Sequence, residues 1–213
     1  MDEPLQDLAD RFSQIASHYD DKHDSEEKPI YNACASLVID HADPRPDDVV
    51  LDLGTGTGLI ALALAENAEC VVGRDISEGM LEHARSKAAD NGIENVEFGY
   101  GEFRDPQYDG EIDVVVSNFA FHHLTDEEKR EATEAIASLG PRRFVLGDAM
   151  FFNSSDPEEP LFGHGVDAAT VGMLVDALTD AGFVLTAVER VHDQVGVLVA
   201  ELAGDDATAD ADT

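Results

Sequence analysis

Apolar residues near the N-terminus recur at the three-to-four-residue spacing of helices. The first set is Leu5, Leu8, Phe12, Ile15 and Tyr19, and the second is Ile30, Cys34, Leu37, Val38 and His41. A polar stretch over residues 20–28 separates the two sets, and Pro44-Arg45-Pro46 breaks the chain after them. We therefore expect two N-terminal helices ahead of the first strand.

Beyond residue 44 the pattern changes to short apolar runs that alternate with helical spacing. The runs begin at Val49 and then span residues 70–75, 96–100, 112–116, 144–146, 183–191 and 195–202. The expected helices between them begin at N-caps such as Ser77 and Thr125 and end at Gly92, Gly140 and Gly182. Strands that alternate with helices predict an α/β fold with a doubly wound, mostly parallel sheet.

The last two apolar runs are joined too closely for a parallel crossover. Only His192-Asp193-Gln194 separates them, whereas a parallel connection needs about a dozen residues or more. The two runs must therefore pair as an antiparallel hairpin. The expected sheet has seven strands and reverses at its last strand, unlike the dinucleotide-binding sheet, which is parallel throughout.

A glycine-rich turn follows the first strand and opens a helix over residues 59–65. Gly54, Gly56 and Gly58 alternate with two threonines directly after Asp52-Leu53. Glycine accepts positive φ and has no Cβ, so this turn brings backbone N–H groups close to a ligand at a helix N-terminus. A dinucleotide fingerprint needs a glycine at position 59, where this chain has leucine. The turn favours another nucleotide-like cofactor, with a purely structural turn as the alternative.

Ligands of open α/β sheets bind beyond the carboxyl ends of the strands. Asp75 ends the second strand, and an ionised carboxylate there can accept both ribose hydroxyls of an adenosine, as NAD enzymes also do. Ile76 and Met80 follow it and are candidates for packing on adenine, although Met80 is equally suited to the core of its helix.

The segment after the fourth strand, residues 117–124 (Ser-Asn-Phe-Ala-Phe-His-His-Leu), carries a family resemblance. Together with the D-x-G-x-G-x-G turn, residues 75–81 and Tyr19-Asp20, it resembles class I S-adenosylmethionine (SAM) methyltransferases. The resemblance is strongest to small-molecule enzymes of the quinone-biosynthesis type and to uncharacterised bacterial enzymes with a similar F-H-H-L-T-D-E-E-K stretch. It spans most of residues 10–202 and implies a Rossmann-like methyltransferase fold with a reversed seventh strand.

The resemblance implies a set of cofactor contacts. Glu102 stands where the family usually has an Asp that faces the adenine amino group, and Phe103 would cover the adenine face. Ser117 and Phe119 would lie near the methionyl group. The residues expected to bind SAM are Tyr19, Gly54, Thr55, Gly56, Gly58, Asp75, Ile76, Met80, Glu102, Phe103, Ser117 and Phe119.

His122 and His123 are the candidate catalytic residues. Histidine titrates near neutrality, so one of them is a candidate general base toward a substrate hydroxyl. Side chains of neighbouring residues diverge, which disfavours a shared metal ion, and no metal is expected. The alternative is that one ring packs on the sheet and the other shapes the pocket.

Composition narrows the range of partners. The chain has 213 residues with 46 acidic and 13 basic side chains, a formal net charge of −33. Because 43% of the residues are hydrophobic and the periodic patterns are clear, we expect a folded protein with an acidic shell suited to high salt, and hence a halophilic source. No basic patch is visible for a nucleic acid or an anionic membrane surface. Cys34 and Cys70 are expected to be free, buried thiols.

The N-terminus, Met1-Asp2-Glu3-Pro4, has no signal-peptide pattern, and no apolar run approaches a membrane span, so we expect a cytoplasmic protein. We expect N-terminal helices that cap the site over residues 1–43, a SAM-binding domain over 44–203 and a disordered acidic tail over 204–213. The phenylalanine-rich loop over 150–165 is expected to help roof an apolar or aromatic substrate pocket.

These features predict a SAM-dependent methyltransferase that acts on a small-molecule acceptor. SAM already carries an activated methyl group, so alignment of the acceptor and exclusion of water would supply much of the rate. A SAM-binding protein without catalysis and an NAD(P)-dependent oxidoreductase are the alternatives. The acceptor, the atom methylated and the oligomeric state are left open by the sequence.

Overall fold

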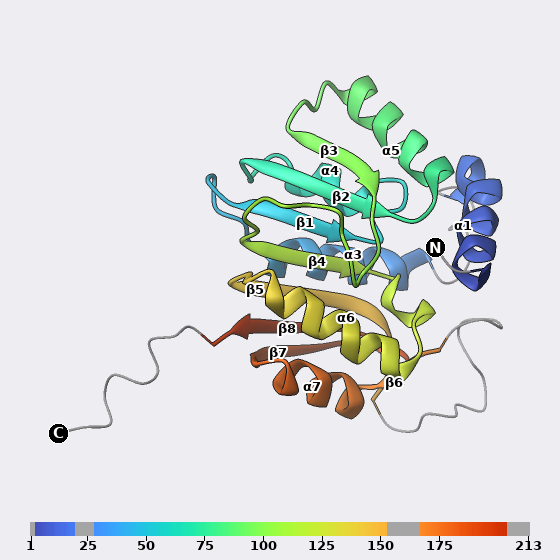
Figure 1. The fold of residues 1–213 in the computed structure, drawn as a ribbon. Helices are drawn as coiled ribbons and strands as arrows, with labels where there is room; N and C mark the ends of the chain where they lie inside the picture. Colours follow the sequence, from blue (N-terminus) through green and yellow to red (C-terminus); the bar gives the residue numbers. More distant parts are fainter. Residues whose placement is uncertain (1–2, 20–27, 153–166, 204–213) are drawn as a thin grey trace.

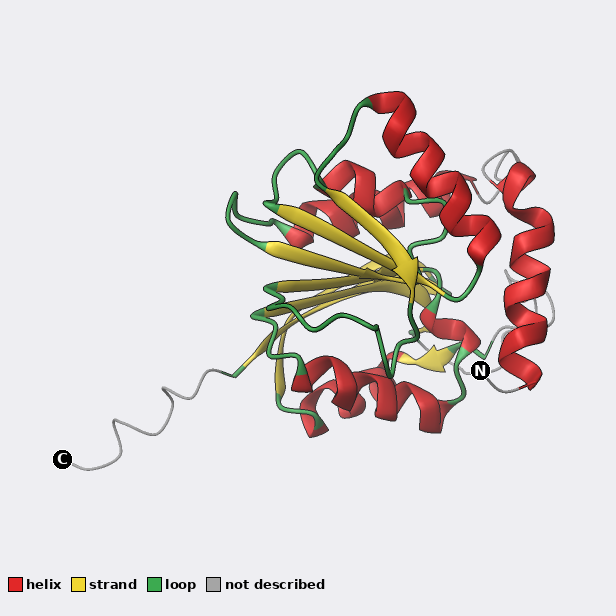
Figure 2. Ribbon diagram, turned by 45° about the horizontal axis from the view of Figure 1, so that its top comes forward, coloured by secondary structure: helices red, strands yellow, loops and turns green. Residues whose placement is uncertain are grey.

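Helices cover both faces of a twisted, mostly parallel sheet (Figures 1 and 2). This computed structural model describes residues 3–19, 28–152 and 167–203. The polar stretch 20–27, most of the phenylalanine-rich loop and the acidic tail lie outside the described residues.

The sheet has the order β3-β2-β1-β4-β5-β8-β7, with the two-residue β6 beside β5. Its strands are β1 (Val49–Leu53), β2 (Cys70–Asp75), β3 (Val96–Tyr100), β4 (Val114–Asn118), β5 (Arg143–Phe151), β6 (Ala169–Thr170), β7 (Phe183–His192) and β8 (Val195–Leu202). The strands from β3 to β5 pair in parallel, whereas β8 runs antiparallel to both β5 and β7. The expected terminal hairpin is confirmed, and so is the reversal that it imposes on the sheet.

The helices and 3₁₀ turns connect these strands. They are α1 (Glu3–Ile15), η1 (Ala16–His18), α3 (Lys28–Ala42), α4 (Leu59–Leu64), α5 (Glu78–Asn91), η2 (Phe121–His123), α6 (Asp126–Ser138) and α7 (Val171–Asp180). Ser77 caps α5 by accepting a hydrogen bond from the Met80 N–H, and Thr125 forms a capping box with Glu128 at the start of α6. The expected caps are therefore confirmed.

Two apolar cores lie on opposite faces of the sheet. Side chains of α3 and α4, such as Val38 and Leu64, pack on one face, and those of α6 and α7, such as Ile136 and Leu178, pack on the other. Val114, Val115 and Val116 of β4 are completely buried, as expected for a central strand covered on both sides. Burial on this scale fixes the strand ends rigidly, and the strand ends position the site.

The bounds of β4 and β5 differ from the sequence expectation, and the two-residue β6 is a strand that the sequence did not predict. β4 begins two residues later than expected, at Val114, and ends two residues later, at Asn118. β5 extends to Phe151, well beyond the expected end at 146, because β8 pairs with it as far as Ala149 and β6 pairs with Met150 and Phe151. The added segment of β5 includes Gly147 and Asp148, which interrupt its apolar pattern.

The two N-terminal helices have different surroundings. α3 packs on the sheet, with Cys34 and Val38 completely buried. α1 stands beyond the carboxyl ends of the strands (Figures 1 and 2) and contacts α5 there. The Ser13 and Ser77 hydroxyls are 2.9 Å apart, and the Gly79 N–H donates to Ser13 Oγ over 3.3 Å. A Cβ at Gly79 would lie 2.8 Å from the Ser13 Cα, so glycine is what allows this approach.

Within the described ranges, no helix combines the length and the apolarity that crossing a bilayer requires.

Candidate functional site

A cavity of about 490 Å³ lies at the carboxyl edge of the parallel strands and is lined by the loops at the strand ends and by α1. Its polar walls come from the loops after β1, β2, β3 and β4, as expected for an open α/β sheet. Its apolar wall includes Leu5, Leu8 and Phe12 of α1 together with Tyr31, Leu59 and Leu124. The helix that begins the chain therefore forms part of the site.

The glycine turn after β1 forms the floor of this cavity. Gly54, Gly56 and Gly58 all have positive φ, at 71°, 53° and 84°. A Cβ at Gly54 would lie 2.3 Å from the Ala120 Cβ, whereas a Cβ at Gly56 would meet no atom within 4 Å. Gly56 thus presents bare backbone to the open space of the cavity. Gly58 does not line the cavity, and a Cβ there would lie 3.1 Å from that of Ala84 on α5.

Asp75 faces the turn from the end of β2. One carboxylate oxygen accepts a hydrogen bond from the Gly56 N–H (2.8 Å), and the other accepts from the Ser77 N–H (2.9 Å). Burial raises the pKa of Asp75, and these backbone donors act in the opposite direction. A carboxylate has about four acceptor positions, so Asp75 can still accept from the hydroxyls of a ligand.

Asp52 is a second carboxylate at the cavity floor, although its side chain is almost completely buried. The Thr55 hydroxyl donates to it over 2.6 Å. Burial raises the pKa of Asp52 to about 7, and the charge of Asp75 contributes in the same direction. The two carboxylates therefore create a negative site that a cationic ligand would stabilise.

The loop after β3 forms one side wall. Glu102 and Phe103 both line the cavity, and the Tyr100 hydroxyl donates to the Glu102 carboxylate. The neighbouring Arg104 is bound by the carboxylates of Glu131, at 2.8 Å, and Glu128, at 3.8 Å. The positive charge of Arg104 is thus balanced by acidic partners. Carboxylates outnumber basic side chains among the residues that line the cavity.

The end of β4 differs from the expectation. Ser117 is completely buried and does not line the cavity, whereas Asn118 does, because alternate side chains of a strand point to opposite faces. Phe119 lines the cavity with φ at +53°, a backbone conformation that bulky side chains rarely adopt. Its N–H donates to the Gly147 carbonyl over 2.9 Å, and its ring lies 4.1 Å from that of Tyr31.

The two histidines have separate environments. His123 lines the cavity, and its ring packs edge-on against Phe12 of α1 at 5.3 Å. His122 is buried and does not line the cavity, because its Nδ1 is bound to Asp148 on β5 at 2.5 Å. In the part of the chain that the structure describes, no three potential metal ligands come together.

Most of the residues expected to bind the cofactor surround this one cavity. The expected cofactor-binding residues that line it are Tyr19, Gly54, Thr55, Gly56, Asp75, Ile76, Met80, Glu102, Phe103 and Phe119, and those that do not are Gly58 and Ser117. Of the two candidate catalytic residues, His123 lines the cavity and His122 does not. The N-terminal helices over residues 1–43 were expected to cap the site, and α1 contributes Leu5, Leu8 and Phe12 to the cavity wall. Asn118 was not among the expected site residues, because it lies two residues beyond the expected end of the fourth strand.

Comparisons with known proteins agree with this geometry. Residues 50–140 match the family described as "Methyltransferase domain". An uncharacterized methyltransferase of Bacillus licheniformis is 33% identical over 147 residues, which cover 67% of each chain.

Solved structures resemble the whole fold. Magnesium protoporphyrin IX methyltransferase from Synechocystis, solved with bound SAM, has a TM-score of 0.70 at 22% identity and covers 95% of this chain and 99% of its own. A complex of the protein DhpI with S-adenosylhomocysteine (SAH) has a TM-score of 0.73 at 20% identity, covering 93% and 97%. At these low identities the two structures show that the fold is shared, and the shared fold covers more of the chain than the family match over residues 50–140.

Proposed function

We propose that this chain, which belongs to the methyltransferase-domain family and is a SAM-dependent methyltransferase, transfers the methyl group of SAM to a small-molecule acceptor. SAM supplies a methyl group activated by a sulfonium. The observation that carries the proposal is the acidic cavity at the strand ends, with a bare glycine turn as its floor and an apolar helix as its outer wall.

The residues around the cavity suit SAM in charge and in shape. Asp75 is placed to accept hydrogen bonds from ribose hydroxyls, and Gly56 leaves room for close approach to the backbone. Phe103 and Ile76 offer apolar surface for adenine, with Glu102 as the carboxylate beside it. Asp52 and Asp75 favour a cation such as the sulfonium. A dinucleotide would instead bring its anionic diphosphate toward these carboxylates, which disfavours the NAD(P) alternative.

A small acceptor is supported by the size and lining of the cavity and by charge. Leu5, Leu8 and Phe12 of α1 form an apolar wall of a cavity of about 490 Å³. The net charge of −33 repels a polyanion, so a nucleic acid is a poor acceptor. The acceptor expected from these features is a compact molecule with apolar surface.

Transfer from methyl-labelled SAM tests this proposal. The protein, in molar KCl, is incubated with labelled SAM and either a fractionated small-molecule extract or bulk RNA, DNA and protein. We expect label in an organic-soluble or low-molecular-mass product, and none in the macromolecules. Label confined to RNA, DNA or protein would contradict the small-molecule acceptor. SAM binding without turnover on any small-molecule fraction would also contradict the proposed acceptor class.

A further inference from the structure

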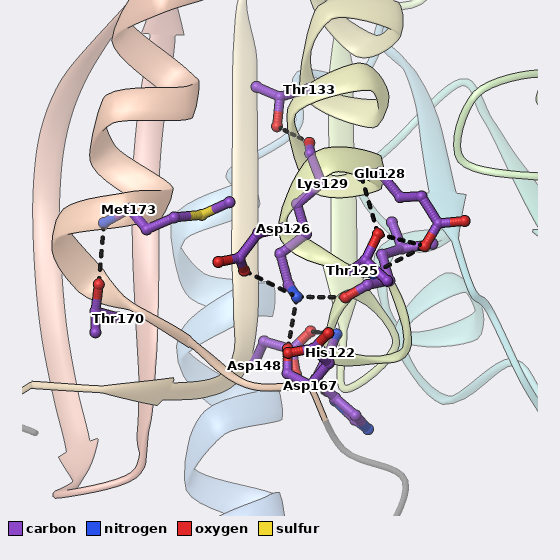
Figure 3. A network of polar contacts seen from close by, with 11 residues as sticks. His122, Thr125, Asp126, Glu128, Lys129, Thr133, Asp148, Asp167, Thr170 and Met173 are labelled. Atoms are coloured by element: carbon purple, nitrogen blue, oxygen red, sulfur yellow. Dashed lines mark hydrogen bonds and ion pairs between the residues drawn. The ribbon is translucent and has the colours of Figure 1, made fainter. Parts of the chain in front are cut away.

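Polar groups of β5 and α6 converge around His122, the residue before His123 in the chain; Figure 3 shows Asp148, Lys129 and Asp167 close to His122. Asp148 of β5 is 2% exposed, and its carboxylate accepts hydrogen bonds from the His122 backbone N–H (3.0 Å) and binds His122 Nδ1 (2.5 Å). The His122 carbonyl in turn accepts from the Asp167 N–H over 2.8 Å. The residue before His123 is therefore fixed through its N–H, its carbonyl and its ring.

Lys129 of α6 fixes the residue after His123. Its side chain is 2% exposed, and its ammonium donates to the Leu124 carbonyl and, over 2.5 Å, to the Asp167 carbonyl. Burial lowers the pKa of Lys129, while the nearby carboxylates of Asp167, Asp126 and Asp148 act in the opposite direction. Figure 3 shows the Lys129 side chain reaching from α6 toward Asp126 and Asp167.

His123 is the cavity-facing member of this arrangement. Its own N–H donates to the Ala120 carbonyl over 3.3 Å, and its ring lies between that of Phe12, at 5.3 Å, and that of His122, at 4.1 Å. Burying a lysine, a carboxylate and an imidazole together involves a desolvation penalty that an apolar cluster would avoid. What these groups provide instead is a fixed location for one imidazole beside the end of β4.

We propose that His123 takes the proton of a phenolic hydroxyl on the acceptor, and that Asp148 and Lys129 are positioning residues for it. The inference rests on the proposed methyltransferase function and names its acceptor class. A thiol with a pKa of about 8.5 is already partly ionised near neutrality, whereas a phenol with a pKa of about 10 needs a base. The aromatic and aliphatic wall of Phe12, Tyr31 and Leu8 suits an aromatic acceptor.

The step balances without any further reactant. The acceptor oxygen forms a bond to the methyl carbon while the carbon–sulfur bond breaks, and the sulfur keeps that electron pair, which leaves SAH. The phenolic proton passes to the neutral imidazole of His123 and then to water. The net products are the methyl ether, SAH and one proton.

Two acceptors of different acidity test the role of His123. Transfer from labelled SAM is measured with phenol and with 4-nitrophenol, which ionises far more readily, for the wild type, His123→Asn and His123→Gln. A general base contributes about 100-fold or more. We therefore expect His123→Asn to lower kcat with phenol by about 100-fold, and with 4-nitrophenol by less than about tenfold. A merely structural role would lower both equally, and that result would overturn the proposal. Failure of the wild type to methylate any phenol would overturn the acceptor class.

A matched pair of aspartates tests the positioning role. Asp148→Asn should lower kcat with phenol by about tenfold and leave the KM for SAM unchanged, because it disturbs only the support of His123. Asp126→Asn is the control, since Asp126 also approaches Lys129, at 3.7 Å, but its side chain is 64% exposed. Equal kcat values for the two variants would contradict the positioning role. SAH affinity is measured by calorimetry on each variant. A variant that binds SAH as the wild type does is folded and binds the cofactor, so a lower kcat then reflects the positioning of His123. A wild type that binds SAH but methylates no acceptor would instead mean that the proposed function fails.

Discussion

The carboxylate of Asp52 lies at the floor of the cavity with 1% of its surface exposed, next to the Thr55 hydroxyl and within the field of Asp75. An ionised carboxylate in such a place is unfavourable unless a cation or several donors compensate it. Thr55 supplies one donor. A cationic ligand would supply the missing charge, so this residue couples the stability of the protein to its cofactor.

Asp52→Asn should therefore change how stability depends on pH. The pKa of Asp52 is raised to about 7 in the folded protein, so the folded state retains a proton that the unfolded state has lost between about pH 4 and pH 7. This group therefore makes the wild type less stable as pH rises through that window. We expect the variant to match the wild type near pH 4 and to be more stable above pH 7, by up to about 4 kcal/mol. Urea unfolding at several pH values measures this difference.

An exposed aspartate provides the control for that experiment. Asp90→Asn removes a charge from the exposed surface of α5. It should leave the difference between the free energies of unfolding at pH 4 and pH 8 nearly the same as in the wild type. A difference between Asp52→Asn and wild type that does not vary with pH would contradict the account of Asp52.

The contact of α1 with α5 decides how closely the apolar wall approaches the site. Gly79 and Gly172 occupy the same position, the second residue after a Ser or Thr cap, in α5 and α7. A Cβ at Gly79 would lie 2.8 Å from the Ser13 Cα, whereas at Gly172 the nearest atom would be 3.9 Å away. The two glycines therefore form a matched pair, because they have the same position in their helices but only Gly79 is in close contact with α1.

Gly79→Ala should displace α1, and Gly172→Ala should not. Alanine is favoured over glycine in a helix by about 1 kcal/mol, so Gly172→Ala is expected to be neutral or stabilising. We expect Gly79→Ala to weaken SAH binding by about threefold to tenfold and to speed proteolysis near residue 19, because the clash with Ser13 opens the wall. Calorimetry and limited proteolysis measure both effects. Equal behaviour of the two variants would show that the α1 contact does not support the site.

The sequence predicted most of the elements because their signals are local. The caps at Ser77 and Thr125 and the short link at 192–194 each depend on a few neighbouring residues. The placement of Asp148 beside His122 and the α1 residues that line the cavity depend on contacts between residues far apart in the chain. For α1, the sequence led only to the general expectation that the N-terminal helices cap the site. The glycine turn and Asp75 were predicted because the carboxyl ends of parallel strands must meet at one edge of the sheet.

The molecule as a whole carries 46 acidic and 13 basic side chains. Several arginines form ion pairs with carboxylates in the described residues, such as Arg74 with Glu97 and Arg143 with Glu201. The acidic side chains outnumber the basic ones, so many carboxylates have no basic partner of their own. The remaining carboxylates repel one another across the surface, and this repulsion favours the unfolded state at low ionic strength. The excess of acidic side chains is therefore expected to make the stability of the protein depend on salt concentration.

Molar KCl should raise the Tm substantially. Screening acts over about 10 Å at 0.1 M salt and about 3 Å at 1 M, so most of the surface repulsion is removed across that range. We expect the Tm to rise by about 10 °C or more between these two KCl concentrations, and to rise much less in sucrose. Scanning calorimetry or fluorescence melting measures the Tm. A Tm that is independent of KCl would contradict the prediction of a salt-adapted protein.

Calorimetric binding of SAM, SAH and NAD, in molar KCl, tests the central claim most directly. We expect the wild type to bind SAM and SAH but not NAD. Asp75→Asn should weaken both by about tenfold to 100-fold, since each hydrogen bond to a charged group contributes about 1.5–3 kcal/mol. The Asp90→Asn control should bind as the wild type does. Binding of NAD alone, or SAM affinity that is unchanged in Asp75→Asn, would contradict this assignment of the cavity.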